Sequence, residues 1–246
     1  TGRYARWSAE HGSVTFNLAG FQMAWAGMNE AGLAISTMSL TDTDYPPPDE
    51  RPPLIAPFWV QYQLDTCATV EEVMANDARV RAMGSEDHYL VCDRSGACVA
   101  VEFLDGKTVF HSGQAMPVAA LANKPYLASV QAWQAGLLED RARFRIAADR
   151  VVNFQPSDAT SAVAYAFETL QQASGQAIHG VPTQWSIVFD TANLRVHWRT
   201  ARNAQLRYVD FARLDFACGT PVEMLDVHTP LPGDVSDRLD LYSFRD

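Results

Sequence analysis

Residues 27–38 have the sequence GMNEAGLAISTM, in which a polar turn bounded by two glycines leads into an apolar run. The turn covers residues 27–32, and the run from Leu33 to Met38 predicts a β-strand. Residues 13–18, upstream of the turn, alternate between apolar and polar side chains and are rich in β-branched residues, so they predict another strand. The front of the chain is therefore expected to be β-structure.

Further along the chain, strand patterns and helix patterns follow one another. Strands are expected at residues 89–93, 97–103, 107–110, 118–122, 185–189, 195–199 and 206–209. Helices are expected at residues 58–66, after the N-cap Thr69, and at residues 129–151 and 158–173, while the proline-rich residues 41–53 predict a surface loop. No repeat or linker divides these elements, so we expect a single α+β domain over residues 1–246.

The composition excludes several classes of protein. Of the 246 residues, 48% are hydrophobic, which is enough for a sizeable core and argues against disorder. The chain has 19 Lys and Arg against 29 Asp and Glu, a net charge of −10, which argues against a nucleic-acid partner. No segment approaches the roughly 18 uncharged apolar residues of a membrane span, so no membrane partner is expected.

The cysteines and histidines show no metal-site spacing. Cys67, Cys92, Cys98 and Cys218 form no CxxC pair and have no neighbouring histidine, so no zinc site is expected. Cys92 and Cys98 flank a turn, where a disulfide is one alternative; two half-buried free thiols are the favoured one. His88 has no partner at triad spacing and is predicted to be a structural or surface residue.

A set of motifs occurs in the order found in one enzyme family. They are WSAEHGSVTFN at residues 7–17, GMNEAGL at 27–33, WVQYQLD at 59–65 with TVEEV at 69–73, HYLV at 88–91 with VEF at 101–103, LANKPY at 121–126, RF at 143–144, and WSIVFD at 185–190. In these motifs the chain resembles the linear amide C–N hydrolases, which are the choloylglycine hydrolase and penicillin V acylase relatives among the N-terminal-nucleophile (Ntn) hydrolases. The resemblance implies a four-layer αββα sandwich with two antiparallel sheets. It also implies a hydrolase that cleaves a non-peptide C–N bond without a metal or organic cofactor.

The resemblance also implies roles for individual residues. Asn123 matches the asparagine whose side-chain amide donates to the oxyanion, and the main-chain N–H of Ser39 aligns with the second donor. Arg143 matches the arginine that stabilises the surroundings of the nucleophile. From the residues alone two other interpretations stay open: Asn123 as a turn residue before Lys124-Pro125, and Arg143 as part of a solvated, arginine-rich helix face.

The nucleophile of that family is an N-terminal cysteine, followed by an Arg-Asn-x-Asp-Trp segment. Both belong upstream of Trp7, where this chain has only TGRYAR at residues 1–6, so we expect its first strand pair to be missing. The internal cysteines are not candidates, because an internal cysteine lacks the free α-amine of this mechanism. Two alternatives are kept: Thr1 as an N-terminal nucleophile, and a non-catalytic relative that binds an amide without cleaving it.

Large apolar side chains near the expected site predict a pocket for the acyl group, although ordinary core is the alternative. These side chains are Phe21, Met23, Trp25, Met38 and Phe58. The resemblance implies a small-molecule amide as partner: a conjugated bile salt, a phenoxyacetyl penicillin or an N-acyl homoserine lactone. It slightly favours the periplasm or secretion over the cytoplasm, and a homo-oligomer is left open.

Overall fold

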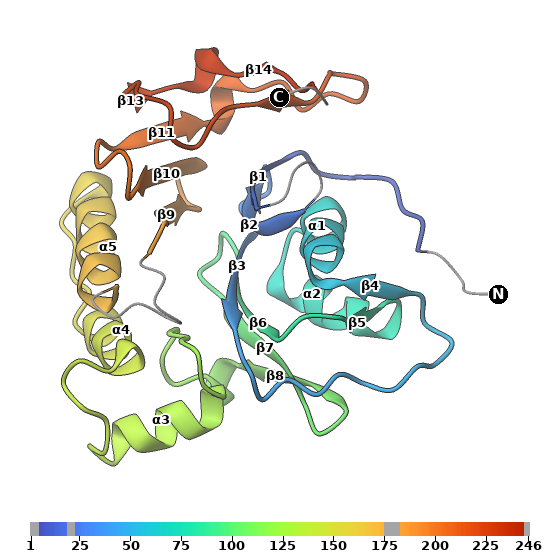
Figure 1. The fold of residues 1–246 in the computed structure, drawn as a ribbon, viewed down its shortest axis with the longest axis vertical. Helices are drawn as coiled ribbons and strands as arrows, with labels where there is room; N and C mark the ends of the chain where they lie inside the picture. Colours follow the sequence, from blue (N-terminus) through green and yellow to red (C-terminus); the bar gives the residue numbers. More distant parts are fainter. Residues whose placement is uncertain (1–4, 19–22, 175–182, 244–246) are drawn as a thin grey trace. The chain divides into compact units, whose positions relative to one another are not determined.

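The computed structural model of the chain describes residues 5–18, 23–174 and 183–243. The fold divides into two compact units, residues 1–153 (unit 1) and residues 154–246 (unit 2). Figure 1 traces both in the colours of the sequence, with the helix and strand labels used from here on. Unit 1 carries the larger sheet and helices α1 to α4, and unit 2 carries a smaller sheet and helix α5.

Unit 1 is organised around an antiparallel sheet with the strand order β1-β2-β3-β6-β7-β8. Its strands are β1 (Ser13–Asn17), β2 (Ala24–Asn29), β3 (Ala34–Ser39), β6 (Asp87–Cys92), β7 (Cys98–Leu104) and β8 (Lys107–Ser112). The predicted turn joins β2 to β3, and Gly32 supplies the positive φ of 90° that this turn requires. A short parallel pair, β4 (Pro53–Ile55) and β5 (Arg81–Met83), lies outside this sheet.

Helix α1 (Ala56–Thr66) packs closely on one face of the sheet, against β2. A Cβ on Gly27 would lie 2.7 Å from Leu64 Cδ1, so only glycine lets the helix approach this closely. Helix α2 (Val70–Ala75) follows, and its N-terminus has the predicted capping box between Thr69 and Glu72. The first core cluster fills this face, and it includes Trp59, Leu64, Tyr89, Val101 and Phe103.

The other face of the sheet carries a second core cluster. Alternate residues of a strand point to opposite faces, and Ala100 therefore joins this cluster while Val99 and Val101 join the first. Helix α3 (Tyr126–Gln134) contributes Tyr126 and Val130, and helix α4 (Arg143–Val152) contributes Phe144 and Ala148. Residues 121–126, which link the sheet to α3, lie on this face.

Two sequence predictions for this region were wrong. The helix expected at residues 129–151 is two helices, α3 and α4, since Gly136 adopts a positive φ of 67° directly after α3. The strand expected at residues 118–122 is irregular. Its apolar side chains are buried in the second core cluster, as they would be in a strand. Its backbone, however, binds side chains and not a neighbouring strand: the Tyr126 hydroxyl donates to Val118 O at 2.9 Å.

The preference for free thiols at residues 92 and 98 was also wrong. Cys92 and Cys98 face each other across β6 and β7 and form a disulfide. The register explains this, because directly opposed residues of an antiparallel pair have Cβ atoms close enough to be bridged.

Reducing this disulfide is expected to lower the free energy of unfolding by about 2 kcal/mol, because the closed loop is short. Urea unfolding with and without reductant measures the difference, and a Cys92→Ser/Cys98→Ser double variant, insensitive to reductant, is the control. Thiol titration of denatured residues 1–246 should find two thiols, Cys67 and Cys218, before reduction. Four thiols at that stage would contradict the bridge.

Asn29 fastens the β2–β3 turn to the end of α1. Its buried side chain donates to Leu64 O at 2.8 Å and to Cys67 O at 2.7 Å, and it accepts from the Leu33 N–H at 3.0 Å. Asn29→Ala leaves these backbone groups without a partner, so we expect it to lower the free energy of unfolding by about 3 kcal/mol or more. Thermal and urea unfolding test this, with the exposed Asn17→Ala as the matched control; equal stability of the two variants would contradict the role.

Unit 2 has a sheet with the strand order β13-β11-β10-β9. The strands are β9 (Trp185–Asp190), β10 (Arg195–Thr200), β11 (Arg207–Asp210) and β13 (Gly233–Asp234), with β12 (Glu223–Met224) and β14 (Asp240–Leu241) forming a separate pair. Helix α5 (Ala159–Ala173) starts at the predicted N-cap Asp158 and packs on β9.

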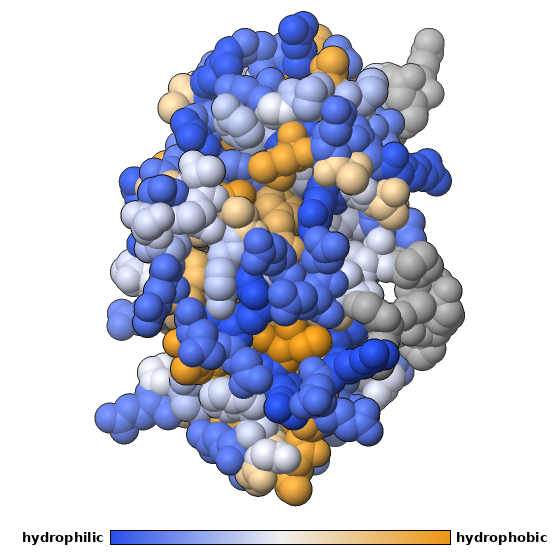
Figure 2. Space-filling model, turned by 90° about the vertical axis from the view of Figure 1, so that its left-hand side faces the viewer, coloured by the Kyte–Doolittle hydropathy of each residue, from blue (hydrophilic) through white to orange (hydrophobic). Residues whose placement is uncertain are grey.

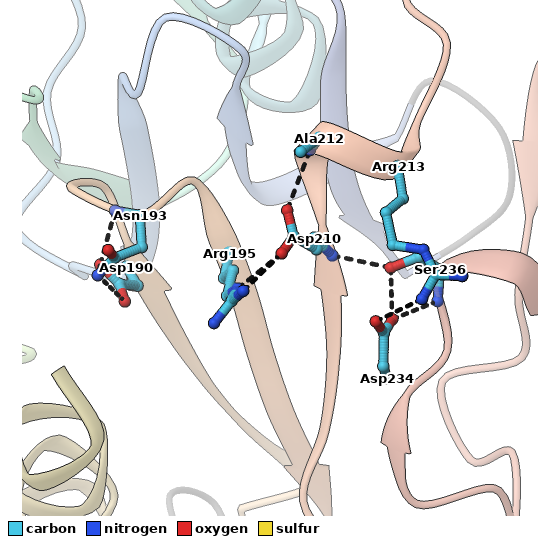
Figure 3. Close-up of polar contacts among 8 residues, drawn as sticks. All are labelled: Asp190, Asn193, Arg195, Asp210, Ala212, Arg213, Asp234 and Ser236. Atoms are coloured by element: carbon cyan, nitrogen blue, oxygen red, sulfur yellow. Dashed lines mark hydrogen bonds and ion pairs between the residues drawn. The ribbon is translucent and has the colours of Figure 1, made fainter.

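Polar contacts tie the strands of unit 2 together at one end (Figure 3). Asp210, the last residue of β11, pairs with Arg195 of β10 at 2.8 Å, and its own N–H donates to Ser236 Oγ at 2.9 Å. The Ser236 hydroxyl in turn donates to Asp234 at 2.6 Å, and Asp234 pairs with Arg213 at 2.7 Å. Because these ion pairs are partly exposed, we assign them to fastening the sheet rather than to chemistry.

Some large apolar side chains are exposed, among them Leu137 and Leu241. In the face shown in Figure 2, hydrophobic residues form separate patches among polar ones. Such scattered apolar residues are usual on a globular surface. No helix within residues 5–18, 23–174 and 183–243 has both the length and the apolar character needed to cross a bilayer.

Candidate active site

The three residues assigned catalytic roles from the sequence lie together in unit 1. Asn123 Nδ2 donates to the main-chain oxygen of Ser39 at 3.0 Å, and Arg143 Nη1 donates to Asn123 Oδ1 at 3.3 Å. The contact with Arg143 fixes the orientation of the Asn123 amide: only its oxygen can accept from the guanidinium, so its nitrogen must face Ser39. The second N–H of Asn123 has no acceptor in the part of the chain that the structure describes.

The backbone of Ser39 faces the Asn123 side chain. It is the last residue of β3, which pairs with β6 beyond the end of β2. Within a β-strand the N–H and C=O of one residue point to the same side of the strand. Because the Ser39 carbonyl faces Asn123, the Ser39 N–H lies on that edge of β3 as well.

Arg143 is the first residue of α4, and the preceding Ala142 provides no side-chain cap. A positive charge at a helix N-terminus opposes the helix dipole, at a cost of about 0.3–1 kcal/mol. The arginine is therefore not placed there to stabilise the helix. Its contact with Asn123 is the feature that distinguishes it from the neighbouring arginines Arg141 and Arg145.

The predicted acyl-pocket residues are only partly brought together. Met38 is half-buried and packs against the second core cluster, next to Ser39 in the chain. Phe58 packs against the first cluster, on the opposite face of the sheet, so it does not share a pocket with Met38. Met23 and Trp25 are half-buried at the start of β2, and Phe21 lies outside the described residues.

The cysteines that the structure describes do not resemble activated nucleophiles. Cys92 and Cys98 are bonded to each other, and Cys218 is exposed. Burial raises the pKa of the Cys67 thiol to about 11, so this thiol is protonated at neutral pH. Nor does any group of three or more His, Cys, Asp or Glu side chains in those parts of the chain have the arrangement needed to hold a metal ion.

A buried polar cluster that the sequence analysis missed lies beneath Asn123. Glu102 of β7 accepts from His88 Nδ1 at 2.9 Å, from His111 Nε2 at 3.1 Å and from the Tyr126 N–H at 2.9 Å. Burial alone would raise the pKa of the Glu102 carboxyl, but these hydrogen bonds outweigh it and lower the pKa to about 2. His88 and Glu102 are both fully buried.

Comparison with solved structures places this fold among known ones. The penicillin V acylase of Agrobacterium tumefaciens superposes with a TM-score of 0.83 at 24% identity, covering 96% of this chain and 83% of that one. A variant of the conjugated bile acid hydrolase of Clostridium perfringens superposes with a TM-score of 0.71 at 13% identity, covering 99% of this chain and 84% of that one.

Comparison of sequences agrees. No family model matches the chain. The curated penicillin V acylase of Pectobacterium atrosepticum is 26% identical over 267 aligned residues, which cover 88% of this chain and 70% of that protein. The resemblance to the penicillin V acylases that the motifs indicate is thereby confirmed, in sequence and in fold. The α+β fold of the Ntn-hydrolase type, with antiparallel sheets and flanking helices, is confirmed as well.

This similarity does not by itself assign the residues. The roles of Asn123, Ser39 and Arg143 stay predictions, supported by their contacts with one another. The Asn123 side chain has a geometry suited to an oxyanion donor: it is oriented by a cation, it is half-buried, and it keeps one N–H without an acceptor in the described ranges.

Proposed function

We propose that this protein is an acylase or amidase that hydrolyses the C–N bond of a linear, non-peptide amide. The observation that carries the proposal is the Asn123 amide, which is held beside the end of β3 where the Ser39 N–H also points. Two N–H donors directed at one position are suited to a tetrahedral oxyanion. The relatives named penicillin V acylase and conjugated bile acid hydrolase support the same class of reaction.

In this proposal the nucleophile is the thiol of an N-terminal cysteine that residues 1–246 do not supply. Its α-amine, with an ordinary pKa of about 7.7–8.0, takes the thiol proton as sulfur attacks the carbonyl carbon. That proton passes to the leaving amine as the C–N bond breaks, and an acyl thioester remains. Water then attacks the thioester, its proton returns through the amine to the sulfur, and the carboxylic acid leaves.

The residues of this chain act on the carbonyl oxygen and the acyl group. Asn123 and the Ser39 N–H stabilise the negative charge that develops on the oxygen, and Arg143 keeps the amide of Asn123 in the donating orientation. Met38, with Met23 and Trp25, is proposed to contact an apolar acyl group. Phe58 is left out of this set because it packs on the other face of the sheet.

The test is turnover by the protein with its native N-terminus, which mass spectrometry identifies. We expect an N-terminal cysteine, and equal amounts of acid and amine from one or more of three probes: penicillin V, a glycine-conjugated bile salt and an N-acyl homoserine lactone. Binding of these amides without turnover would favour the non-catalytic alternative. If Thr1 is the native N-terminus and Thr1→Ala abolishes turnover, threonine is the nucleophile; unchanged turnover rejects it.

We further propose that the protein works in an oxidising compartment, the periplasm or the cell exterior. The Cys92–Cys98 disulfide supports this, since structural disulfides are rare in the reducing cytosol. Cell fractionation with antibody detection of the native protein tests it, and recovery in the cytosolic fraction alone would contradict it.

A further inference from the structure

The segment that carries Asn123 has little regular structure of its own. Residues 121–125 lie between the sheet and α3 without joining a strand or a helix. Oxyanion stabilisation nevertheless depends on a donor that is already in place before the charge develops. Something outside the segment must therefore hold it.

Two hydrogen bonds, one buried and one partly buried, hold this segment at its two ends. His88 Nε2 lies 2.5 Å from the main-chain oxygen of Ala122, the residue before Asn123. At the other end, the N–H of Tyr126, the first residue of α3, donates to Glu102 Oε1 at 2.9 Å. Pro125, at the N-cap position, provides no side-chain cap, so the Glu102 carboxylate takes that place and also interacts favourably with the helix dipole.

The two holding groups also bind each other, through His88 Nδ1 and Glu102 Oε1. Each ring nitrogen of His88 therefore faces an oxygen. A main-chain carbonyl oxygen can only accept, so Nε2 carries a hydrogen. The Glu102 carboxylate faces Nδ1 and also accepts from the Tyr126 N–H, so it connects the ring to the start of α3.

We propose that His88 and Glu102 are positioning residues that fix the backbone from which Asn123 presents its amide. His88 and Glu102 contact each other in the fully buried interior of unit 1. The catalytic consequence rests on the proposed function; the hydrogen bonds do not.

The charged and titratable groups around the ring come from several elements. Glu102 lies on β7, His111 on β8 and Tyr126 on α3, while Asp87 is the neighbour of His88 on β6 and acts on it electrostatically. Of these groups, Glu102 is the one that contacts the ring through a hydrogen bond, so its replacement should have the largest effect on the position of the ring.

The first experiment measures the ring directly and requires no activity. In ¹⁵N NMR of the histidine-labelled protein, we expect Nε2 of His88 to carry a hydrogen, with the signal assigned by its loss in His88→Gln. A wild-type His88 whose Nε2 carries no hydrogen would overturn the proposal, whether or not the protein proves to be an amidase.

The second experiment measures amide hydrolysis. His88→Gln keeps a donor near the Nε2 position and His88→Asn does not, so we expect kcat to fall by up to about 10²-fold in the asparagine variant and by less in the glutamine variant. KM should change little, because the oxyanion forms only in the transition state. Glu102→Gln should also lower kcat, because Glu102 contacts both the His88 ring and the Tyr126 N–H.

His111→Gln is the matched control, since His111 contacts Glu102 but not the backbone of the Asn123 segment. It should keep most of the wild-type kcat. The melting temperature of each variant is measured first, and kcat is assayed at a temperature at which the variant is folded. Equal kcat for folded His88→Gln, His88→Asn and wild type would overturn positioning, whereas absence of turnover in the wild type would count against the proposed function and leave the NMR result to decide.

Discussion

Asn123→Ala is expected to lower kcat for amide hydrolysis by about 10²–10³-fold, the usual cost of removing one oxyanion donor. The side chain is half-buried and contacts only Ser39 and Arg143 in the described ranges, so the fold should lose little stability. Because the interaction is strongest in the transition state, kcat and kcat/KM should fall together while KM stays nearly constant. Steady-state kinetics on the best of the three amide probes measures this.

A second variant separates donation from shape. Asn123→Asp keeps the size of the side chain and can still pair with Arg143, but an ionised carboxylate accepts only and places negative charge where the oxyanion forms. Its loss of kcat should equal or exceed that of the alanine variant. Asn153→Ala, at the exposed C-cap of α4, is the control and should leave kcat unchanged. Full activity in Asn123→Asp would show that the amide is not the donor.

The strands of the central sheet could be predicted from the sequence because they satisfy local rules. Alternation at residues 13–17, the two-glycine turn and the capping box at Thr69 each carry their own signal, and the structure follows them. Residues 118–122 do not form the predicted strand, because an apolar run shows that a segment is buried but not what its backbone binds. Here the backbone accepts hydrogen bonds from the side chains of Tyr126 and His88 and does not pair with a strand. These partners lie outside the run, so the run itself does not reveal them.

The candidate site could be predicted only as separate residues. Asn123, Ser39 and Arg143 were assigned by resemblance, and nothing in their spacing shows that 84 residues of chain return Asn123 to the Ser39 carbonyl. One signal for the buried cluster was present and unused: Glu102 is the single charged residue in the otherwise apolar run CVAVEFL of β7. A carboxylate in the middle of a buried strand needs donors, and His88 and His111 on the two adjacent strands were available.

Arg143→Gln is expected to lower kcat by about 10- to 10²-fold without destabilising the protein. The glutamine removes the cation that donates to Asn123 Oδ1, so the amide can turn its oxygen toward the developing negative charge. At the same time a positive charge leaves the N-terminus of α4, so stability should stay equal or rise by up to about 1 kcal/mol. Parallel kinetics and urea unfolding measure both, with Arg141→Gln, exposed and two residues earlier, as the control.

The double variant Asn123→Ala/Arg143→Gln tests whether Arg143 acts through the Asn123 amide. If it does, replacing Arg143 should lower kcat little further in a protein that already lacks the amide. The two effects on kcat should then be far from additive in a double-mutant cycle. Arg143→Lys should recover part of the loss, because it keeps the charge but not the planar guanidinium. Additive losses in the double variant would mean instead that Arg143 stabilises the reaction independently, and its contact with Asn123 would then be incidental to catalysis.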